Sequence, residues 1–401
     1  MSTLRVGTGR AIITPPLGIQ LAGYGHRTKG ADEVLDELEV RAFWLEQEGA
    51  DGAGSGPACI ITADIIGFDA LLTQRLRTLL TQRLKVAPEA VMLAASHTHS
   101  GPQTCENVVG AGGPPDPYYM NRLVERILQA AGEAQNAAAP VTVHVGKSTL
   151  EGYAVNRRLR VDGQVRMAPN RAGIRDDDVT VVLFRDAATG TPRGLLFHYT
   201  CHPTIMGSYA ITSEYPGAAR RYVERALGGA ACGFLPGCFG DIRPDCTLIG
   251  GKVFRRGTYQ DVQAFGDALG AEVLRAAEQA VALDTPPRLV AAARDVNLPL
   301  AAKPRTASLS LQRLDISPGL RFVALGGEVC VEYGHFIKGL DPDAVTIPVG
   351  YANGMVAYIP TAAMILEGGY EAEGSCRYFG LPSPFKPELE ERIKEAVRAL
   401  F

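Results

Sequence analysis

The sequence lacks an excess of charge of either sign and any long apolar run. Its 401 residues include 40 Lys and Arg against 43 Asp and Glu, which gives a net charge of −3 at pH 7. Because nucleic acids and anionic membrane surfaces attract basic proteins, this balance argues against nucleic acid as a partner. No stretch is apolar for long enough to predict stable membrane insertion. We therefore expect a small molecule as the partner, and the composition indicates no particular oligomeric state.

The sequence also lacks the patterns of exported proteins. The N-terminus, MSTLRVGTGRAIITPP, has no apolar segment behind a basic start, so we expect a cytoplasmic location. The eight cysteines are irregularly spaced and several lie in strand-like runs such as PACIITA, which predicts buried thiols rather than a disulfide framework. Cys232, Cys238 and Cys246 lie close together in sequence, but their spacing does not match a zinc ribbon.

Motifs of two common enzyme classes are missing. No glycine-rich tract has the strand-GxGxxG-helix order or a Walker lysine, so nucleotide binding is not predicted. No GxSxG elbow is present, which argues against the usual α/β-hydrolase. A serine hydrolase that uses Ser100 or Ser213 with a histidine is a remaining alternative, although neither serine has an elbow-like sequence around it.

Strand-like and helix-like segments alternate along the chain. The runs rich in Val, Ile, Leu and Phe predict strands at 38–48, 57–63, 90–96, 141–149, 179–186, 194–200, 231–236, 288–298, 321–326 and 345–350. Helices are predicted at 69–86, 117–136, 214–227, 259–282 and 387–400. This alternation predicts an α/β fold of stacked mixed sheets flanked by helices. We expect one layered domain over 1–401, with a possible internal boundary near 284–288 and a hairpin tip at 48–58.

The most informative stretch is VMLAASHTHSGP, residues 91–102. An apolar run leads into two histidines spaced i, i+2 and then Gly-Pro, which predicts a short buried strand that ends in a cleft. In an extended backbone such side chains point the same way, so His97 and His99 can face one ligand or one metal ion. The alternative is that both imidazoles only make hydrogen bonds near a strand end.

Polar residues follow other predicted strands in the same manner. His202 follows GLLFHY and precedes a proline, and Glu328 follows RFVALGG. Tyr358 lies in a strand-like segment, where a tyrosine is usually a core residue. Because sites in open α/β sheets gather beyond strand ends, histidines and a carboxylate at such positions suggest a zinc site. For Glu328 the alternative is an exposed acid after a double-glycine turn.

Blocks spread over most of the chain resemble the neutral/alkaline non-lysosomal ceramidase family, in its catalytic N-terminal domain. They are GTGRAIITPP, GYGHR, ASHTHSGP, VNRR, CHPT, GDIRP, LGGEV and GYANGMVAYIPTAAMILEGGYE, in this order. HTHSGP is the most specific of them. The resemblance implies the ceramidase catalytic-domain fold and a zinc amidohydrolase of the kind that cleaves the amide of N-acylsphingosine.

The resemblance also implies roles for individual residues. Four residues match zinc ligands: His97, His202, Glu328 and Tyr358. Three more match residues around the metal: His99, Arg157 and Tyr370. Zinc with an open position lowers the pKa of bound water to about 7, which provides a nucleophile without a serine. His99 would then act as general base or proton shuttle, and Arg157 and Tyr370 would stabilise the oxyanion.

The block GDIRP departs from the ceramidases. It has Arg243 where the family carries an essential serine, and an arginine is only a hydrogen-bond donor. If Arg243 faces the cleft, it favours a substrate with a carboxylate or phosphate; otherwise it lies in solvent. Asp241 either orients a histidine near the zinc or only turns the chain before Pro244. Because the sequence ends at Phe401, we also expect it to lack the C-terminal β-sandwich domain of the ceramidases.

We therefore predict a zinc-dependent hydrolase that cleaves an amide-like C–N bond of a small molecule with metal-activated water. One alternative is a hydrolase of a small cyclic or carboxylate-bearing amide rather than of ceramide. Another is a non-catalytic relative that keeps the metal or ligand pocket.

Overall fold

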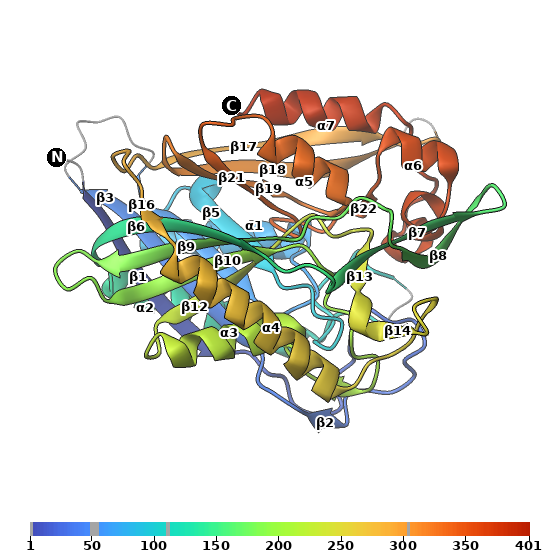
Figure 1. Ribbon diagram of the computed structural model, residues 1–401, viewed down its shortest axis with the longest axis horizontal. Helices are drawn as coiled ribbons and strands as arrows, with labels where there is room; N and C mark the ends of the chain where they lie inside the picture. The colour runs from blue at the N-terminus through green and yellow to red at the C-terminus, as the bar shows by residue number, and fades with distance from the viewer. Residues whose placement is uncertain (1–2, 49–55, 110–112, 303–304) are drawn as a thin grey trace.

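Two large β-sheets with helices packed against them form most of the structure, a computed structural model that describes residues 3–48, 56–109, 113–302 and 305–401 (Figure 1). The larger sheet has the order β12-β10-β9-β6-β1-β3-β4-β5, with β16 beside β6. Its strands are β1 (Thr3–Ile12), β3 (Glu39–Glu48), β4 (Ala58–Ala63), β5 (Val91–Ala95), β6 (Ala139–Thr149), β9 (Asp178–Asp186), β10 (Pro192–Tyr199), β12 (Ala231–Pro236) and β16 (Val281–Ala282). The smaller sheet contains β17 (Val290–Pro299), β18 (Thr306–Ser317), β19 (Leu320–Leu325) and β21 (Val345–Val349).

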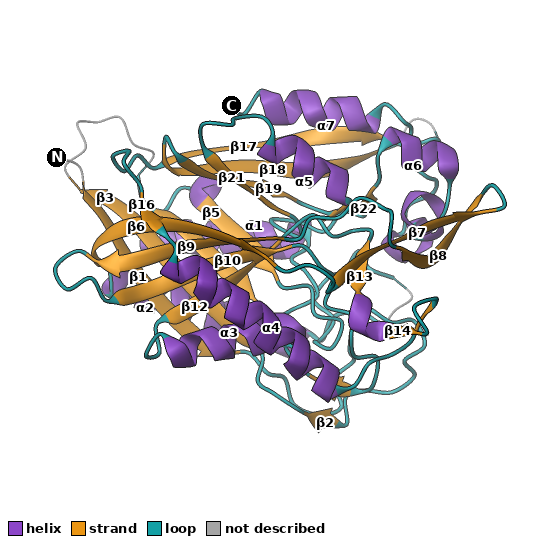
Figure 2. Ribbon diagram, in the orientation of Figure 1, coloured by secondary structure: helices purple, strands orange, loops and turns teal. Residues whose placement is uncertain are grey.

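Helices cover both sheets, as Figure 2 shows. They are α1 (Ala70–Leu84), α2 (Pro117–Asn136), α3 (Glu214–Ala226), α4 (Tyr259–Glu278), α5 (Val331–Lys338), α6 (Ala362–Glu367) and α7 (Leu389–Arg398). α2 packs on β1 and β3, α4 packs on β6 and β9, and α3 lies against α4 and β12. On the smaller sheet α5 contacts β21 and α7 contacts β17. The predicted α/β fold of mixed sheets and helices is confirmed.

The predicted strands coincide with observed ones to within about two residues, and the predicted helices do so with one exception. The helix predicted at 259–282 ends at Glu278, because Val281 and Ala282 pair with β6 as β16. β1 was not predicted because the glycines and polar residues of TLRVGTGRAI hide its half-buried alternation. The hairpin tip predicted at 48–58 lies largely outside the described residues.

Two glycines of β1 allow α2 to lie directly on the strand. A Cβ atom on Gly7 would overlap the carbonyl oxygen of Ala134, and one on Gly9 would overlap that of Ala130. These neighbours are backbone atoms of a helix, which cannot move aside as a flexible side chain can. The close approach of α2 to the sheet therefore depends on both glycines.

Replacing Gly9 with alanine is expected to lower the free energy of unfolding by about 1–3 kcal/mol, because the new methyl group overpacks this interface. Gly132 provides the control, since it lies within α2 and a Cβ atom there would meet no heavy atom within 4 Å. Gly132→Ala is expected to be neutral or to stabilise by up to about 1 kcal/mol through helix propensity. Urea denaturation of both variants measures the difference, and equal effects would contradict the packing described for α2.

The larger sheet curls so that its two edges approach each other. Gly233 of the edge strand β12 lies against Phe43 of β3, which is the third strand counted from the opposite edge. The loop after β21 links both edges, because the N–H of Gly350 donates to the Pro236 carbonyl (2.9 Å) and the N–H of Ala95 donates to the Tyr351 carbonyl (3.2 Å). The carboxyl ends of β5 and β12 are thereby brought to one place.

Both sheets contribute to a common apolar core. Leu314 and Phe322 of the smaller sheet belong to the same buried cluster as Val40 and Leu93 of the larger sheet. Residues 284–288 connect β16 to β17, where the chain passes from one sheet to the other. The shared core supports our proposal that residues 1–401 form one domain.

Two expectations from composition can be compared with the structure. All eight cysteines are free, and all except Cys246 are buried, so the prediction of buried thiols holds for seven of them. None of the helices in the described ranges combines the length and apolar composition needed to cross a bilayer.

Candidate metal centre

Three pairs of parallel strands carry the predicted metal ligands at their ends. β5 runs parallel to β4 and is followed by His97 and His99, and β10 runs parallel to β12 and is followed by His202. The third pair is β20 (Glu328–Val329) and β22 (Tyr358–Ile359), in which Glu328 and Tyr358 are direct register partners. The two histidine segments follow the carboxyl ends of β5 and β10, whereas Glu328 and Tyr358 lie side by side at the start of β20 and β22.

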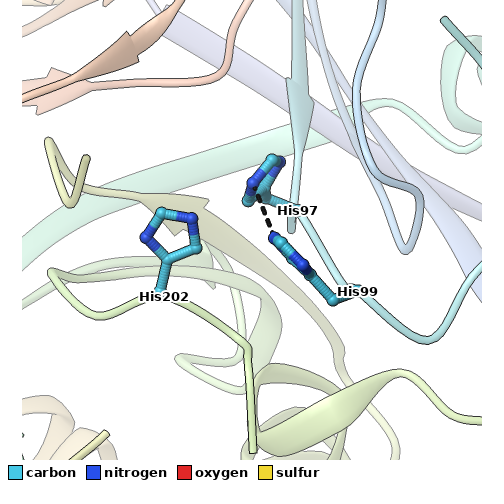
Figure 3. Close-up of side chains that lie close together, drawn as sticks. All are labelled: His97, His99 and His202. Atoms are coloured by element: carbon cyan, nitrogen blue, oxygen red, sulfur yellow. Dashed lines mark hydrogen bonds between the residues drawn. The ribbon is translucent and has the colours of Figure 1, made fainter. Parts of the chain in front are cut away.

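The distances show how closely they gather. The Nε2 atom of His97 lies 3.1 Å from Nε2 of His99 and 3.4 Å from Oε2 of Glu328. The same Oε2 atom lies 3.3 Å from Nε2 of His202. One ring nitrogen from each histidine lies within 4.8 Å of the other two, and Figure 3 shows the three rings turned toward one another. The structure thus brings His97, His99, His202 and Glu328 together.

Each imidazole is oriented by a backbone carbonyl at its Nδ1 atom. The acceptors are Ile66 for His97 (2.6 Å), Gly23 for His99 (3.1 Å) and Phe239 for His202 (2.8 Å). Because a carbonyl only accepts, each Nδ1 carries the proton and each Nε2 presents a lone pair. Ile66 follows β4 and Phe239 follows β12, so in two cases the neighbouring parallel strand delivers the carbonyl that positions the ring.

This donor set fits a metal ion. Two Nε2 lone pairs at 3.1 Å repel each other unless a cation or a proton lies between them. The Nε2 atom of His202 and the Oε2 atom of Glu328 are buried, and neither makes a hydrogen bond with a described residue. Imidazole nitrogens held at Nδ1 by a carbonyl, next to a carboxylate, are typical zinc ligands.

The protonation states also suit metal binding. Burial lowers the pKa of His202 to about 4. Burial and the neighbouring His97 and His202 hold the pKa of His99 well below its ordinary value. Burial alone would raise the pKa of Glu328, but His97 and His202 outweigh it and hold this pKa well below the usual range. Neutral imidazoles beside an ionised carboxylate are the forms that coordinate a metal.

The backbone explanation for the histidine pair requires a correction. The sequence pattern predicts an extended chain through His97 and His99, but β5 ends at Ala95 and His97 has a φ of 64°. This left-handed conformation is uncommon for a residue with a Cβ atom. The N–H of His97 donates to the carbonyl of Ile65 in the loop after β4 (3.0 Å), so the left-handed backbone of a loop residue, rather than strand alternation, directs the ring.

Arg157, Tyr358 and Tyr370 lie beside Glu328. The guanidinium carbon of Arg157 is 5.4 Å from the ring centroid of each tyrosine, and the two rings are 5.3 Å apart. All three residues line a cavity of about 260 Å³ together with His97, His99 and Glu328. Burial raises the pKa of Tyr358 and of Tyr370, so both carry a hydroxyl proton that can be donated.

Glu371 holds Arg157 in place and was not found from the sequence. Its Oε1 accepts from Nε of Arg157 (2.7 Å), and its Oε2 accepts from Nη1 of Arg158 (2.8 Å). Both arginines belong to β7 (Ala154–Val161) and are buried. The available signal was the Arg-Arg pair in VNRR, since two buried guanidinium groups require a buried acid.

Asp241 contacts none of the three histidines through its carboxylate. Its Oδ2 accepts from Nδ2 of Asn156 (2.7 Å) and its Oδ1 accepts from the N–H of Val331 (2.9 Å). The backbone carbonyls described above take the positions at which a carboxylate would orient the rings. Of the two roles considered for Asp241, the contacts favour the structural one, which joins β7 to the start of α5.

Arg243 and Tyr24 line the same cavity. Arg243 belongs to β13 (Ile242–Pro244), and its guanidinium carbon lies 4.4 Å from the ring centroid of Phe254 in β15 (Val253–Phe254). The ring of Tyr24 lies 5.0 Å from that of His99. Tyr24 was not singled out from the sequence, where the only signal was an aromatic residue between two glycines in GYGHR.

The two serines considered as nucleophiles lie elsewhere. Ser100 is buried, and the hydroxyl of Ser213 donates to the Asp36 carboxylate. Neither is among the described residues that line the cavity with the histidines. Their positions give no support to a serine hydrolase.

The fold and the site define a mixed α/β protein with a candidate metal centre at strand ends. Its sequence matches the family described as neutral/alkaline non-lysosomal ceramidase, N-terminal, over residues 4–293. The chain therefore belongs to this family of hydrolases. A comparison with curated proteins gives no match.

Two solved structures share the fold. Neutral ceramidase from Pseudomonas aeruginosa superposes with a TM-score of 0.81 at 18% identity, over 100% of this chain and 75% of that chain. A ceramidase complexed with C2 superposes with a TM-score of 0.80 at 17% identity, over 99% of this chain and 74% of that chain.

Proposed function

We propose that the protein is a zinc-dependent amidohydrolase that cleaves the C–N bond of an N-acyl amide. The observation that carries this proposal is the convergence of imidazole Nε2 atoms and the Glu328 carboxylate at 3.1–3.4 Å beside a cavity. Membership in a ceramidase family supports an amide as the bond that is cleaved.

In this proposal His97, His202 and Glu328 hold the metal, with Tyr358 as a weaker fourth ligand next to Glu328. Imidazole and carboxylate ligands suit zinc, and a raised tyrosine pKa suits a neutral, longer contact. When bound, zinc lowers the pKa of a water molecule from 15.7 to about 7 and so supplies a nucleophile at neutral pH.

The remaining residues bind the substrate and move protons. Arg157, fixed by Glu371, and Tyr370 donate hydrogen bonds to the amide oxygen, where negative charge develops. His99 accepts a proton at Nε2 and passes it to the leaving nitrogen. A second role for His99, as a third imidazole ligand, is favoured by its Nδ1 contact with Gly23, which matches the contacts of the other two rings.

The test uses the purified protein with a panel of N-acyl amides before and after chelation. Chelation is expected to abolish hydrolysis and added zinc to restore it. His99→Gln is expected to keep its zinc and to lose about 10²–10⁴-fold in kcat, as removal of a proton-transfer group does.

Two results would change these assignments. Zinc lost from His99→Gln would make His99 a ligand. Full activity after chelation would contradict the metal proposal and revive a serine nucleophile, whereas bound zinc without turnover of any amide would indicate a binding protein.

A further inference from the structure

The cavity beside the metal centre contains a cation that has no anionic partner in the described part of the chain. Arg243 lines the cavity with His99 and Glu328. Within the described ranges its guanidinium makes neither an ion pair nor a hydrogen bond, and its Nε atom is buried without a partner. Arg157 in the same cavity is instead neutralised by Glu371. The free charge in this cavity is therefore that of Arg243.

Several contacts fix Arg243 next to the metal centre. β13 pairs with β7 so that Arg243 faces Val155 in register. The carbonyl of the preceding residue, Ile242, accepts from the N–H of His202 (3.4 Å). The guanidinium stacks on Phe254, which holds its plane while leaving its N–H groups available.

An arginine in this position is suited to a carboxylate. Burial lowers the pKa of Arg243, but a guanidinium starts so high that it remains charged at neutral pH. Half-buried cations are normally paired, because desolvation is costly without a partner. The guanidinium matches a planar carboxylate in a bidentate arrangement, and the single positive charge of Arg243 balances the single negative charge of a carboxylate.

The rest of the cavity is suited to a short acyl chain. Its apolar lining residues are Ile66, Val108, Met167, Met355 and Phe379. The volume of about 260 Å³ is just below the range of about 300–1,000 Å³ usual for ligand pockets and favours a small substrate. An acyl group on these side chains, an amide at the metal centre and an anion at Arg243 would fill the space.

We propose that the substrate is a short N-acyl amino acid whose free carboxylate binds Arg243 while its amide oxygen faces Arg157 and Tyr370. This inference rests on the proposed amidohydrolase function. Hydrolysis breaks the amide C–N bond, adds the oxygen of water to the acyl carbon and transfers a proton to the nitrogen. The products are a carboxylic acid and a free amino acid.

The test compares N-hexanoylglycine with N-hexanoylpropylamine, which has a similar shape and no charge. The wild type is expected to prefer the charged substrate by about 10- to 100-fold in kcat/KM, the range for a hydrogen bond between charged groups. Arg243→Gln is expected to lose this preference mainly through a higher KM for N-hexanoylglycine, and Arg243→Lys to keep part of it. The control is Arg126→Gln, which removes the same charge from α2, where Arg126 contacts Gln129 outside the cavity.

Calorimetric titration of N-hexanoylglycine separates this inference from the proposed function. If no form cleaves either amide but Arg243→Gln binds N-hexanoylglycine about tenfold more weakly than wild type, the hydrolase proposal fails and the anion site stands. Equal affinity in both proteins, no binding by the wild type, or equal loss of both activities in Arg243→Gln would overturn the role of Arg243. Thermal unfolding of each variant verifies that it is folded.

Discussion

Replacing His202 with alanine is expected to remove the metal and to reduce amide hydrolysis at least about a thousandfold. The ring is completely buried, and its Nε2 lies 3.3 Å from the Glu328 carboxylate, so alanine at this position removes one of the three proposed ligands. Removing a residue that only hydrogen-bonds to a zinc ligand typically lowers metal affinity about 10- to 100-fold. Removing a ligand itself is expected to lower the affinity further. A bound metal stabilises the transition state by several kcal/mol, so the rate of hydrolysis is expected to fall when the metal is lost.

Zinc analysis after gel filtration and kcat/KM for an N-acyl amide measure this effect. His144→Gln serves as the control, because His144 lies on β6 and contacts Thr142 rather than the centre. The control is expected to keep both metal and activity. Retention of one tightly bound zinc by His202→Ala would mean that the metal lies elsewhere.

Replacing Glu371 with glutamine is expected to lower the free energy of unfolding at pH 7 by about 3–5 kcal/mol, because two buried guanidinium groups lose their common counter-charge. Arg157 and Arg158 are 4% and 7% exposed, so water cannot compensate fully. Activity is expected to fall as well, since Arg157 is no longer held toward the substrate oxygen. Glu373→Gln in the same short helical segment is the control, because Glu373 is exposed.

This loss is expected to depend on pH. Burial alone would raise the pKa of Glu371, but Arg157 and Arg158 outweigh it and hold the pKa below its ordinary value. A depressed carboxyl pKa stabilises the protein above the unfolded-state pKa of about 4.3, and this contribution is lost as the pH falls through the folded-state value. Urea denaturation from pH 3 to pH 7 should show the two proteins converging at low pH, and a constant difference would contradict the assigned ion pairs.

Much of the fold follows from local pattern. The apolar runs at 90–96 and 194–200 identified β5 and β10, because strands covered on both faces have few polar residues. β1 was not predicted because Gly7 and Gly9 interrupt its strand pattern. The same two glycines allow α2 to pack closely on the strand. Because Val281 and Ala282 pair with β6, α4 ends at Glu278, earlier than the composition of residues 259–282 suggests.

The candidate site was predictable in its residues but not in its geometry. His97, His99, His202 and Glu328 were identified as residues near strand ends, yet their convergence depends on the curl of the larger sheet and on the left-handed backbone conformation of His97. The groups that orient the rings are the carbonyls of Ile66, Gly23 and Phe239, and any residue type can supply a carbonyl. Glu371 is separated from Arg157 by more than 200 residues, so its pairing depends on tertiary structure.

The most direct measurement is anomalous diffraction at the zinc edge from crystals of the zinc-loaded protein. We predict one ion per chain, bound by Nε2 of His97, Nε2 of His202 and a carboxylate oxygen of Glu328. Zinc-loaded crystals with no ion among these three residues, or with the ion bound at another place, would contradict the assignment of this cluster as a metal centre.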